Sequence, residues 1–237
     1  MVCGRQSAAK GLVAIVPVKK SRSSKLRSLN FSALIFALLA FGCANPAANK
    51  PKATVGNAAP ETSAPNTTGT ETLRISPENS KIEFTAAKVT RSHNGLFKQF
   101  SGTIDLIAGD ILQSRVTVNI DAASVVTDTD DLTAHLKTAD FFDVAKFPKA
   151  TFTSTKIEPA SGNNATHTVT GNFELHGIKK SISFPATIVA TPADVAVSTE
   201  FAINRRDFGL VYPGKADDLN RDGVVIKLTV RVPRKTS

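Results

Sequence analysis

The chain has 237 residues and an apolar content of 41%, which suits one or two globular domains of ~100–200 residues each. Its net charge of +9 comes mainly from residues 1–42, which hold seven basic and no acidic side chains and leave 22 basic against 20 acidic groups elsewhere. Nucleic-acid binding is therefore not expected of the rest of the chain. Fourteen Phe, one Tyr and no Trp predict a dry interior, a core or a lipid-lined cavity, and no acid–base catalysis.

The N-terminal segment has the pattern of an export signal. A basic region is followed by the uncharged run FSALIFALLAFG at 31–42, which ends at Cys43 and is well short of the ~20 residues that span a bilayer. The segment ALLAFGC resembles a bacterial lipobox, in which Cys43 would be lipidated and begin the mature protein. We therefore predict a lipoprotein-type signal peptide over 1–42 and a lipid-anchored protein on the periplasmic side of a bacterial membrane. Ala44 after the cysteine favours the outer membrane.

Residues 43–71 are dominated by Ala, Pro, Asn, Thr and Gly and show no apolar periodicity. Such a composition offers little to offset the entropy lost on ordering, so a disordered tether is expected here. The folded domain is then predicted to occupy 72–234.

Short strands with period-two alternation of apolar and polar residues fill this domain, with turn signals between them. The clearest lie at 82–86, 116–121, 169–175, 195–203 and 226–232, and further strand candidates lie at 100–107, 150–157 and 181–190. Eight or nine strands with one polar face indicate an antiparallel sandwich or an up-and-down barrel. An eight-stranded barrel can enclose one small ligand.

One stretch, 132–152, lacks this alternation of apolar and polar residues. It starts like a helix, with Leu132, His135 and Leu136 on one face, and residues 127–130 precede it as N-cap candidates. Pro148 ends any helix before the next strand. We predict a short helical segment near 129–143 that plugs the barrel.

Four sequence motifs resemble those of the YceI-like family of exported polyisoprenoid-binding proteins. They are GLFKQFSG at 95–102, the HL…DFFDV…FPKATF pattern over 135–152, GNFELHG at 171–177 and NRRDFG at 204–209. The resemblance covers nearly all of 72–234. It implies an all-β, lipocalin-like antiparallel barrel whose hydrophobic tunnel takes an isoprenoid lipid or a quinone, with no established catalysis and no cofactor. Leu132, Thr133 and Ala134 replace an Arg-Asp pair that often precedes the family's histidine.

The candidate lipid-binding residues are one histidine and ten phenylalanines that could line the tunnel. They are Phe84, Phe97, Phe100, His135, Phe141, Phe142, Phe147, Phe152, Phe173, Phe201 and Phe208. Core packing and ligand lining share the inward face of a barrel, so the sequence leaves both open for the phenylalanines. His135 could meet a headgroup or hydrogen-bond a backbone carbonyl. Arg205, Arg206 and Asp207 are expected to form an ion-paired corner.

Other functions stay open as alternatives. A packed barrel could serve as an interaction or stress-protection module, and an enzyme would have to use His135. The DLNRDG run at 218–223 matches half of a calcium loop but lacks the closing Glu, so a polar hairpin is favoured and no metal is expected. A homodimer is a further open alternative.

Overall fold

The computed structural model describes residues 45–60, 69–160, 162 and 165–234. The predicted signal segment and Cys43 lie outside these residues. No helix in the described part of the chain is long and apolar enough to cross a membrane.

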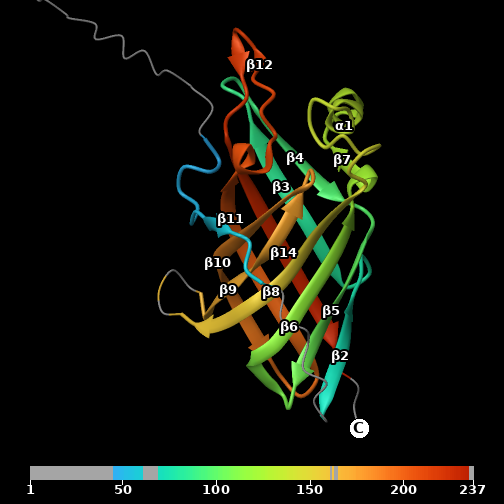
Figure 1. The fold of residues 1–237 in the computed structure, drawn as a ribbon, viewed down its shortest axis with the longest axis vertical. Coiled ribbons are helices and arrows are strands. Elements are labelled where there is room, and N and C mark those ends of the chain that lie inside the picture. Colours follow the sequence, from blue (N-terminus) through green and yellow to red (C-terminus); the bar gives the residue numbers. More distant parts are fainter. Residues whose placement is uncertain (1–44, 61–68, 161, 163–164, 235–237) are drawn as a thin grey trace, which may run out of the picture. The chain divides into compact units, whose positions relative to one another are not determined.

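The described strands form an antiparallel barrel, which confirms the predicted fold class (Figure 1). The first three barrel strands are each interrupted once and so consist of two segments, and five continuous strands follow them. The interrupted strands are β2 (Thr70–Ile75) with β3 (Ser80–Ala87), β4 (Ser92–Phe97) with β5 (Phe100–Ile107), and β6 (Asp110–Asp121) with β7 (Val125–Thr127). The others are β8 (Lys149–Pro159), β9 (His167–Leu175), β10 (Ile178–Ala190), β11 (Asp194–Asn204) and β14 (Gly223–Pro233). Each barrel strand is hydrogen-bonded to the next one in the chain. The last strand, β14, pairs with β3 of the first, so the sheet closes into a barrel.

The alternation seen in the sequence fixes which side chains face the barrel interior. In β11, Val195, Phe201 and Ile203 are buried, whereas Ser198 and Glu200 are exposed. Two motif glycines let phenylalanine rings lie flat over neighbouring strands, because a Cβ at Gly95 would stand 2.2 Å from the Phe84 ring. A Cβ at Gly171 would likewise stand 2.5 Å from the Phe152 ring. These glycines therefore make room for interior rings.

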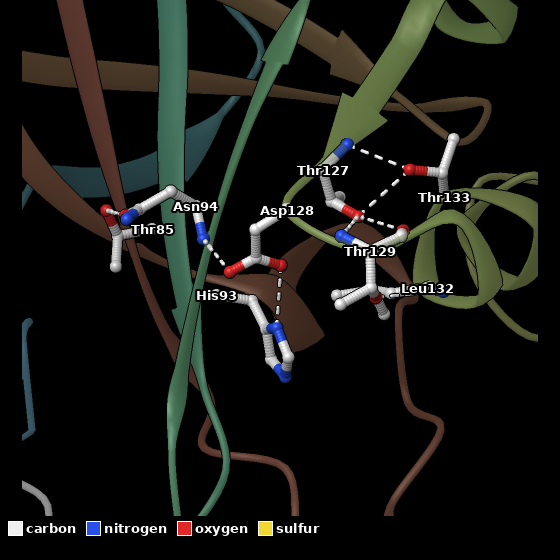
Figure 2. A network of polar contacts seen from close by, with 8 residues as sticks. All are labelled: Thr85, His93, Asn94, Thr127, Asp128, Thr129, Leu132 and Thr133. Carbon is white, nitrogen blue, oxygen red and sulfur yellow. Dashed lines mark hydrogen bonds and ion pairs between the residues drawn. The ribbon is translucent and has the colours of Figure 1, made fainter.

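The predicted helical segment is α1 (Asp130–Leu136), which lies at the same end of the barrel as the short strands β12 (Gly214–Lys215) and β13 (Asp218–Leu219) (Figure 1). Its N-cap is Thr129, one of the four predicted candidates, and the Thr129 side chain accepts from the Leu132 N–H. Figure 2 shows that the Thr133 hydroxyl also accepts from the Thr127 N–H, at 2.8 Å. Thus α1 is fixed to the end of β7 by hydroxyl groups.

Asp128 holds this region to strand β4 (Figure 2). Its carboxylate oxygens lie 2.8 Å from His93 Nδ1 and 3.4 Å from the Asn94 N–H that donates to it. Partial burial would raise the pKa of Asp128, but the His93 contacts and the Asn94 N–H outweigh it and lower that pKa from its ordinary value. Two 3₁₀ turns, η1 (Ala122–Ser124) and η2 (Arg205–Phe208), complete the described helices.

Residues 45–60 differ from the disordered tether predicted over 43–71. They form a segment, here called the strap, whose strand β1 (Thr54–Asn57) pairs with residues 180–183 of β10. On the other side, Ala53 N–H donates to Ala202 O of β11, and Ala202 N–H donates to Pro51 O. The strap therefore lies between β10 and β11. The expectation of disorder does not hold for it.

The physical reason for this correction lies in the barrel wall. Residues 187–190 of β10 pair with β11, but that ladder stops near Pro185, which has no N–H to donate. The strap supplies the missing backbone partners, so its order rests on hydrogen bonds and not on apolar periodicity. Further along, Asn172 donates to Ala59 O and accepts from Ala59 N–H at 2.8 and 2.9 Å. Ala47 is buried against Ala202 and Val225.

Candidate functional site

An apolar cavity of about 150 Å³ lies inside the barrel and is here called the central cavity. Its lining side chains come from the inward faces of the strands, and Ser80 and Thr199 are the polar ones among them. Four predicted residues line it: Phe97, Phe152, Phe173 and Phe201. Phe184, which was not predicted, stacks on Phe201 with ring centroids 4.2 Å apart. The wall is therefore mainly aliphatic, with five phenylalanine rings set among Ile, Val and Leu side chains.

A second cavity of about 130 Å³, the α1-end cavity, lies beneath the helix. Leu132 and Leu136 of α1 and the two phenylalanines that follow it, Phe141 and Phe142, form one side. Phe84, Phe97 and Phe173 are predicted residues that also line it. The Phe97 ring lies 5.9 Å from both Phe84 and Phe142, so it stands at the centre of this wall.

The two cavities adjoin, because the same five residues line both of them. These shared residues are Phe97, Ile120, Phe173, Ile203 and Ile226. Together the cavities approach the lower end of the ~300–1,000 Å³ typical of small-molecule sites. Side-chain movement of Phe97 or Phe173 would join them into one path.

Five polar or charged residues are among those that line the α1-end cavity, although its surface is almost wholly apolar. Lys88, His93, Arg205, Asn220 and Arg221 line it. Arg205 is only 4% exposed, and its Nε and Nη1 donate to the backbone carbonyls of Arg221 and Leu210. Burial lowers the pKa of the Arg205 guanidinium, Asp222 opposes that shift, and Arg206 adds to it.

The ion-paired corner predicted at Arg205, Arg206 and Asp207 has a different carboxylate. Asp222 lies 3.0 Å from Arg205 Nη2 and 2.7 Å from Arg206 Nε. Asp222 is 16 residues beyond Arg206 and reaches it because residues 205 and 222 meet where β11 ends and β14 begins. Local sequence could not reveal that pairing.

Four predicted tunnel residues do not line either cavity. Phe100 is buried in the strand core, and Phe208 is fully buried with its ring against Phe173 at 5.1 Å. Phe147 packs against His176 and leaves no room for a side chain at Gly177. These three rings fill structural positions: Phe147 and Phe208 lie in a turn and a 3₁₀ turn, which do not follow the inward alternation of strands, whereas Phe100 opens strand β5.

His135, the fourth, lies outside the cavities, and its ring is flanked by Phe141 and Tyr212. Its Nε2 lies 2.8 Å from Asp140 Oδ2, so its partner is a carboxylate and not the backbone carbonyl considered above. Figure 1 places this helix at one end of the barrel. His135 therefore acts on the position of the residues that follow α1 and does not reach the cavity interior.

Sequence reasoning missed Phe184 and the basic lining residues. Phe184 lies in the predicted strand 181–190 on the face of Ile182 and Ala186, so the alternation could have identified it. Lys88 and Arg221 come from turns and loops, where no periodicity applies. Their contribution follows only from the closed barrel.

Of the predicted polar hairpin at 218–223, Asp218 and Leu219 form strand β13, which pairs with β12, and the turn of that hairpin precedes the run. Its side chains contact protein groups: Asp218 accepts from Thr90, Asn220 donates to Tyr212 O, and Asp222 pairs with the two arginines. In the described residues, no group of three His, Asp or Glu side chains is arranged to hold a metal ion.

This geometry agrees with the results of sequence comparison. Residues 73–232 match the YceI-like domain. The chain belongs to the YceI-like family. YceI-like relatives include the UPF0312 proteins of Pseudomonas savastanoi pv. phaseolicola and Pseudomonas syringae pv. syringae, each 32% identical over 142 residues, or 55% of this chain and 73% of theirs.

Two solved structures resemble this YceI-like chain. Burkholderia cenocepacia BcnA has a TM-score of 0.56 and 26% identity, covering 64% of this chain and 95% of its own. A polyisoprenoid binding domain from Saccharophagus degradans has a TM-score of 0.54 and 18% identity, covering 69% and 98%. The second likeness concerns the fold alone.

The YceI-like motif departs from the common pattern where Leu132 and Thr133 precede the histidine. Leu132 lines the α1-end cavity, and Thr133 bonds the Thr127 N–H. The replacement thus provides an apolar wall and a local hydrogen bond.

Proposed function

We propose that this protein binds an isoprenoid-type lipid, with the apolar chain enclosed in the barrel. The observation that carries this proposal is the pair of adjoining cavities lined almost wholly by Phe, Leu, Ile and Val. Such a surface favours a hydrocarbon chain through the hydrophobic effect and offers the chain's interior no polar partner. A polyisoprenoid binding domain of the same fold supports the choice of ligand class.

The size of the cavities bears on how the lipid would enter. The central and α1-end cavities, of about 150 and 130 Å³, suit a short chain or part of a long one as they stand. A longer chain requires the shared rings Phe97 and Phe173 to turn aside. The loops and α1 then form the entrance, because the wall on that side is not held by a strand ladder.

The proposal includes export and a lipid anchor at Cys43 on the periplasmic side of a bacterial membrane, and Ala44 favours the outer membrane. The strap begins at Asn45, two residues after Cys43. At ~3.3–3.6 Å per residue, an anchor there would lie within ~7 Å of the strap's first residue. The barrel would then stand close to the bilayer that holds its ligand. Mass spectrometry of the membrane fraction should find diacylated Cys43, and an unmodified N-terminus beyond it would contradict this part.

A matched pair of variants tests lipid binding itself. Leu228 faces the central cavity, and its neighbour Thr229 is exposed on the outer face of β14. Leu228→Trp should fill the cavity and lower uptake of a short-chain polyprenol from vesicles by ~10-fold or more, whereas Thr229→Trp should leave it unchanged. Equal uptake by both variants would place any binding outside the barrel.

An interaction module with a packed barrel is the outcome if the wild-type chain takes up no polyprenol at all. An enzyme using His135 is not favoured by the geometry, because His135 lies outside both cavities and contacts Asp140. Turnover that His135→Ala abolishes would be needed to support it.

A further inference from the structure

The barrel wall between β10 and β11 is not closed by a continuous ladder. Only residues 187–190 of β10 pair with β11, whereas 178–186 pair with β9 on the other side, and β11 pairs with β14 over its whole length. The strap fills part of the opening, because β1 pairs with 180–183 of β10. Residues 184–186 of β10 pair with neither β1 nor β11, so a gap remains between the strap and the short ladder.

A groove of about 740 Å³ lies on the outside of the barrel at this gap. Its sides are residues 48–51 of the strap, 185–187 of β10 and 198–200 of β11. Among the described residues that line it, Thr199 is the one that also lines the central cavity. The Thr199 hydroxyl donates to Pro185 O across the gap, at 2.5 Å. One side chain therefore separates the groove from the central cavity.

The strap beside this gap has little apolar surface to hold it. Residues 45–60 contain no Leu, Ile, Met or aromatic side chain, and the strap side chains that pack against the main core are Ala53 and Val55. Lys50 lies 2.6 Å from Glu200 of β11, but this ion pair is partly exposed, and such pairs contribute little. Segments with few buried apolar contacts separate from a fold most readily. The strap is thus the part of this wall that opens with the smallest loss of packing.

The end of the barrel away from α1 is closed by packed side chains. Leu73, Leu106, Val195 and Val232 are buried there and line neither cavity. Val195 pairs with Val232 where β11 begins and β14 ends, opposite the end that carries α1 (Figure 1). A lipid chain that enters at the α1 end and exceeds both cavities therefore meets a closed core at the far end. The wall is thinner at Thr199.

We propose that the strap and Thr199 form a side portal, through which the far end of a long isoprenoid chain leaves the central cavity. The strap separates from the wall, and the chain takes the place of Ala53 and Val55 against the inner faces of β10 and β11. This inference rests on the proposed lipid-binding function and names chain length as the property that the strap controls. Short chains bind with the strap in place, and long chains bind only when it is released. The strap precedes residues 73–232, which match the family domain, so the portal is a feature of this chain.

A reversible disulfide tests whether the strap must move. Thr54 of the strap and Ser183 of β10 are directly opposite in an antiparallel ladder, an arrangement that a disulfide can span. The full chain carries Thr54→Cys and Ser183→Cys, with Cys3→Ser and Cys43→Ser to prevent other pairings. Uptake of farnesol and of decaprenol from vesicles is measured for the oxidised and the reduced protein. Oxidation should lower decaprenol uptake by ~10-fold or more and change farnesol uptake by less than ~2-fold, because the locked protein cannot populate the open state.

A second disulfide serves as the matched control. Lys81 of β3 and Thr229 of β14 are also directly opposite, on the outer face of a ladder away from the strap. Oxidation of Lys81→Cys with Thr229→Cys, in the same Ser background, should leave the uptake of both polyprenols within ~2-fold of the reduced protein.

Hydrogen exchange of the wild-type chain gives a readout that needs no disulfide. Decaprenol should reduce the protection of residues 53–57, whereas farnesol should leave it unchanged. Asn172→Ala, which frees the strap at Ala59, should raise decaprenol uptake by ~3-fold and leave farnesol uptake unchanged. These two results decide the question if the cysteine variant fails to fold or to oxidise.

Equal decaprenol uptake by the oxidised and reduced strap variant would overturn the side portal and leave lipid binding standing. Retained protection of residues 53–57 in the decaprenol complex would do the same, and so would uptake of farnesol without any uptake of decaprenol by the wild-type chain. Failure of both polyprenols to bind would overturn the proposed function together with the inference.

Discussion

The central cavity is lined by strand residues alone, whereas the α1-end cavity has a wall made of α1 and the loops around it. Strands present every second residue to the interior, so the wall of the central cavity is apolar except for Ser80 and Thr199. Helix and loop residues follow no such rule, and charged residues such as Lys88 and Arg221 are found among the residues that line the α1-end cavity. Under the proposed function, the two cavities would have separate tasks: the central cavity would hold the lipid chain, and the α1-end cavity would admit it.

The largest effect is expected in the strand-walled half. Phe201 is 2% exposed and stacked on Phe184, so Phe201→Ala should lower the free energy of unfolding by ~3–5 kcal/mol. Urea unfolding measures this change, with the exposed neighbour variant Ser198→Ala expected within ~0.5 kcal/mol of wild type. A loss below ~1 kcal/mol for Phe201→Ala would mean that the central cavity is loosely packed and adaptable.

The helical wall should respond differently. Leu136 is buried against Phe84 and Val125, and Leu136→Ala should lower the free energy of unfolding by ~2–4 kcal/mol. It should also speed lipid release, because α1 forms the entrance, whereas Phe201→Ala should change release less. Stopped-flow exchange of a bound fluorescent lipid measures both rates. Faster lipid release from Phe201→Ala than from Leu136→Ala would contradict the proposal that α1, and not the strand wall, forms the entrance.

The strap concerns the strand-walled half of the barrel, because it lies between β10 and β11 where these two strands do not pair with each other. Asn172→Ala removes two hydrogen bonds to the Ala59 backbone and should lower the free energy of unfolding by ~1–3 kcal/mol. Hydrogen exchange should show lost protection over residues 53–59. Retained protection there would show that the β1–β10 ladder alone fixes the strap.

The smallest effect concerns the link between α1 and β4. The pKa of Asp128 is lowered in the folded chain, so its carboxylate stabilises the fold above the ordinary pKa of ~3.9 and this contribution is lost as pH falls through the folded value. Asp128→Asn should lower the free energy of unfolding at neutral pH by less than ~1 kcal/mol, because the side chain is largely exposed. The two proteins should converge in strong acid. A difference that grows on acidification would contradict the sign.

Much of the strand-walled half could be predicted from the sequence. Alternation placed Phe152, Phe173 and Phe201 on the inner face, and the N-cap pattern placed α1 correctly. The same reasoning failed at Phe147 and Phe208, because it relied on residue type in segments without strand periodicity, and at Phe100, which opens strand β5 and is buried outside both cavities.

The order of the strap and the positions of Lys88 and Arg221 depend on long-range geometry. Asn172 meets Ala59 across 113 residues, and Arg221 meets Lys88 across 133. Composition correctly showed that 45–60 lacks apolar periodicity, but it could not show a gap in the barrel ladder that accepts backbone hydrogen bonds. Only the closed barrel creates these partners.

Native mass spectrometry of the full chain, purified from its own cells in mild detergent, tests the central claim most directly. We predict a bound mass equal to one isoprenoid-type lipid on the wild-type chain and on Thr229→Trp, and its loss from Leu228→Trp. An empty wild-type chain that also fails to take up polyprenol from vesicles would contradict lipid binding in the barrel.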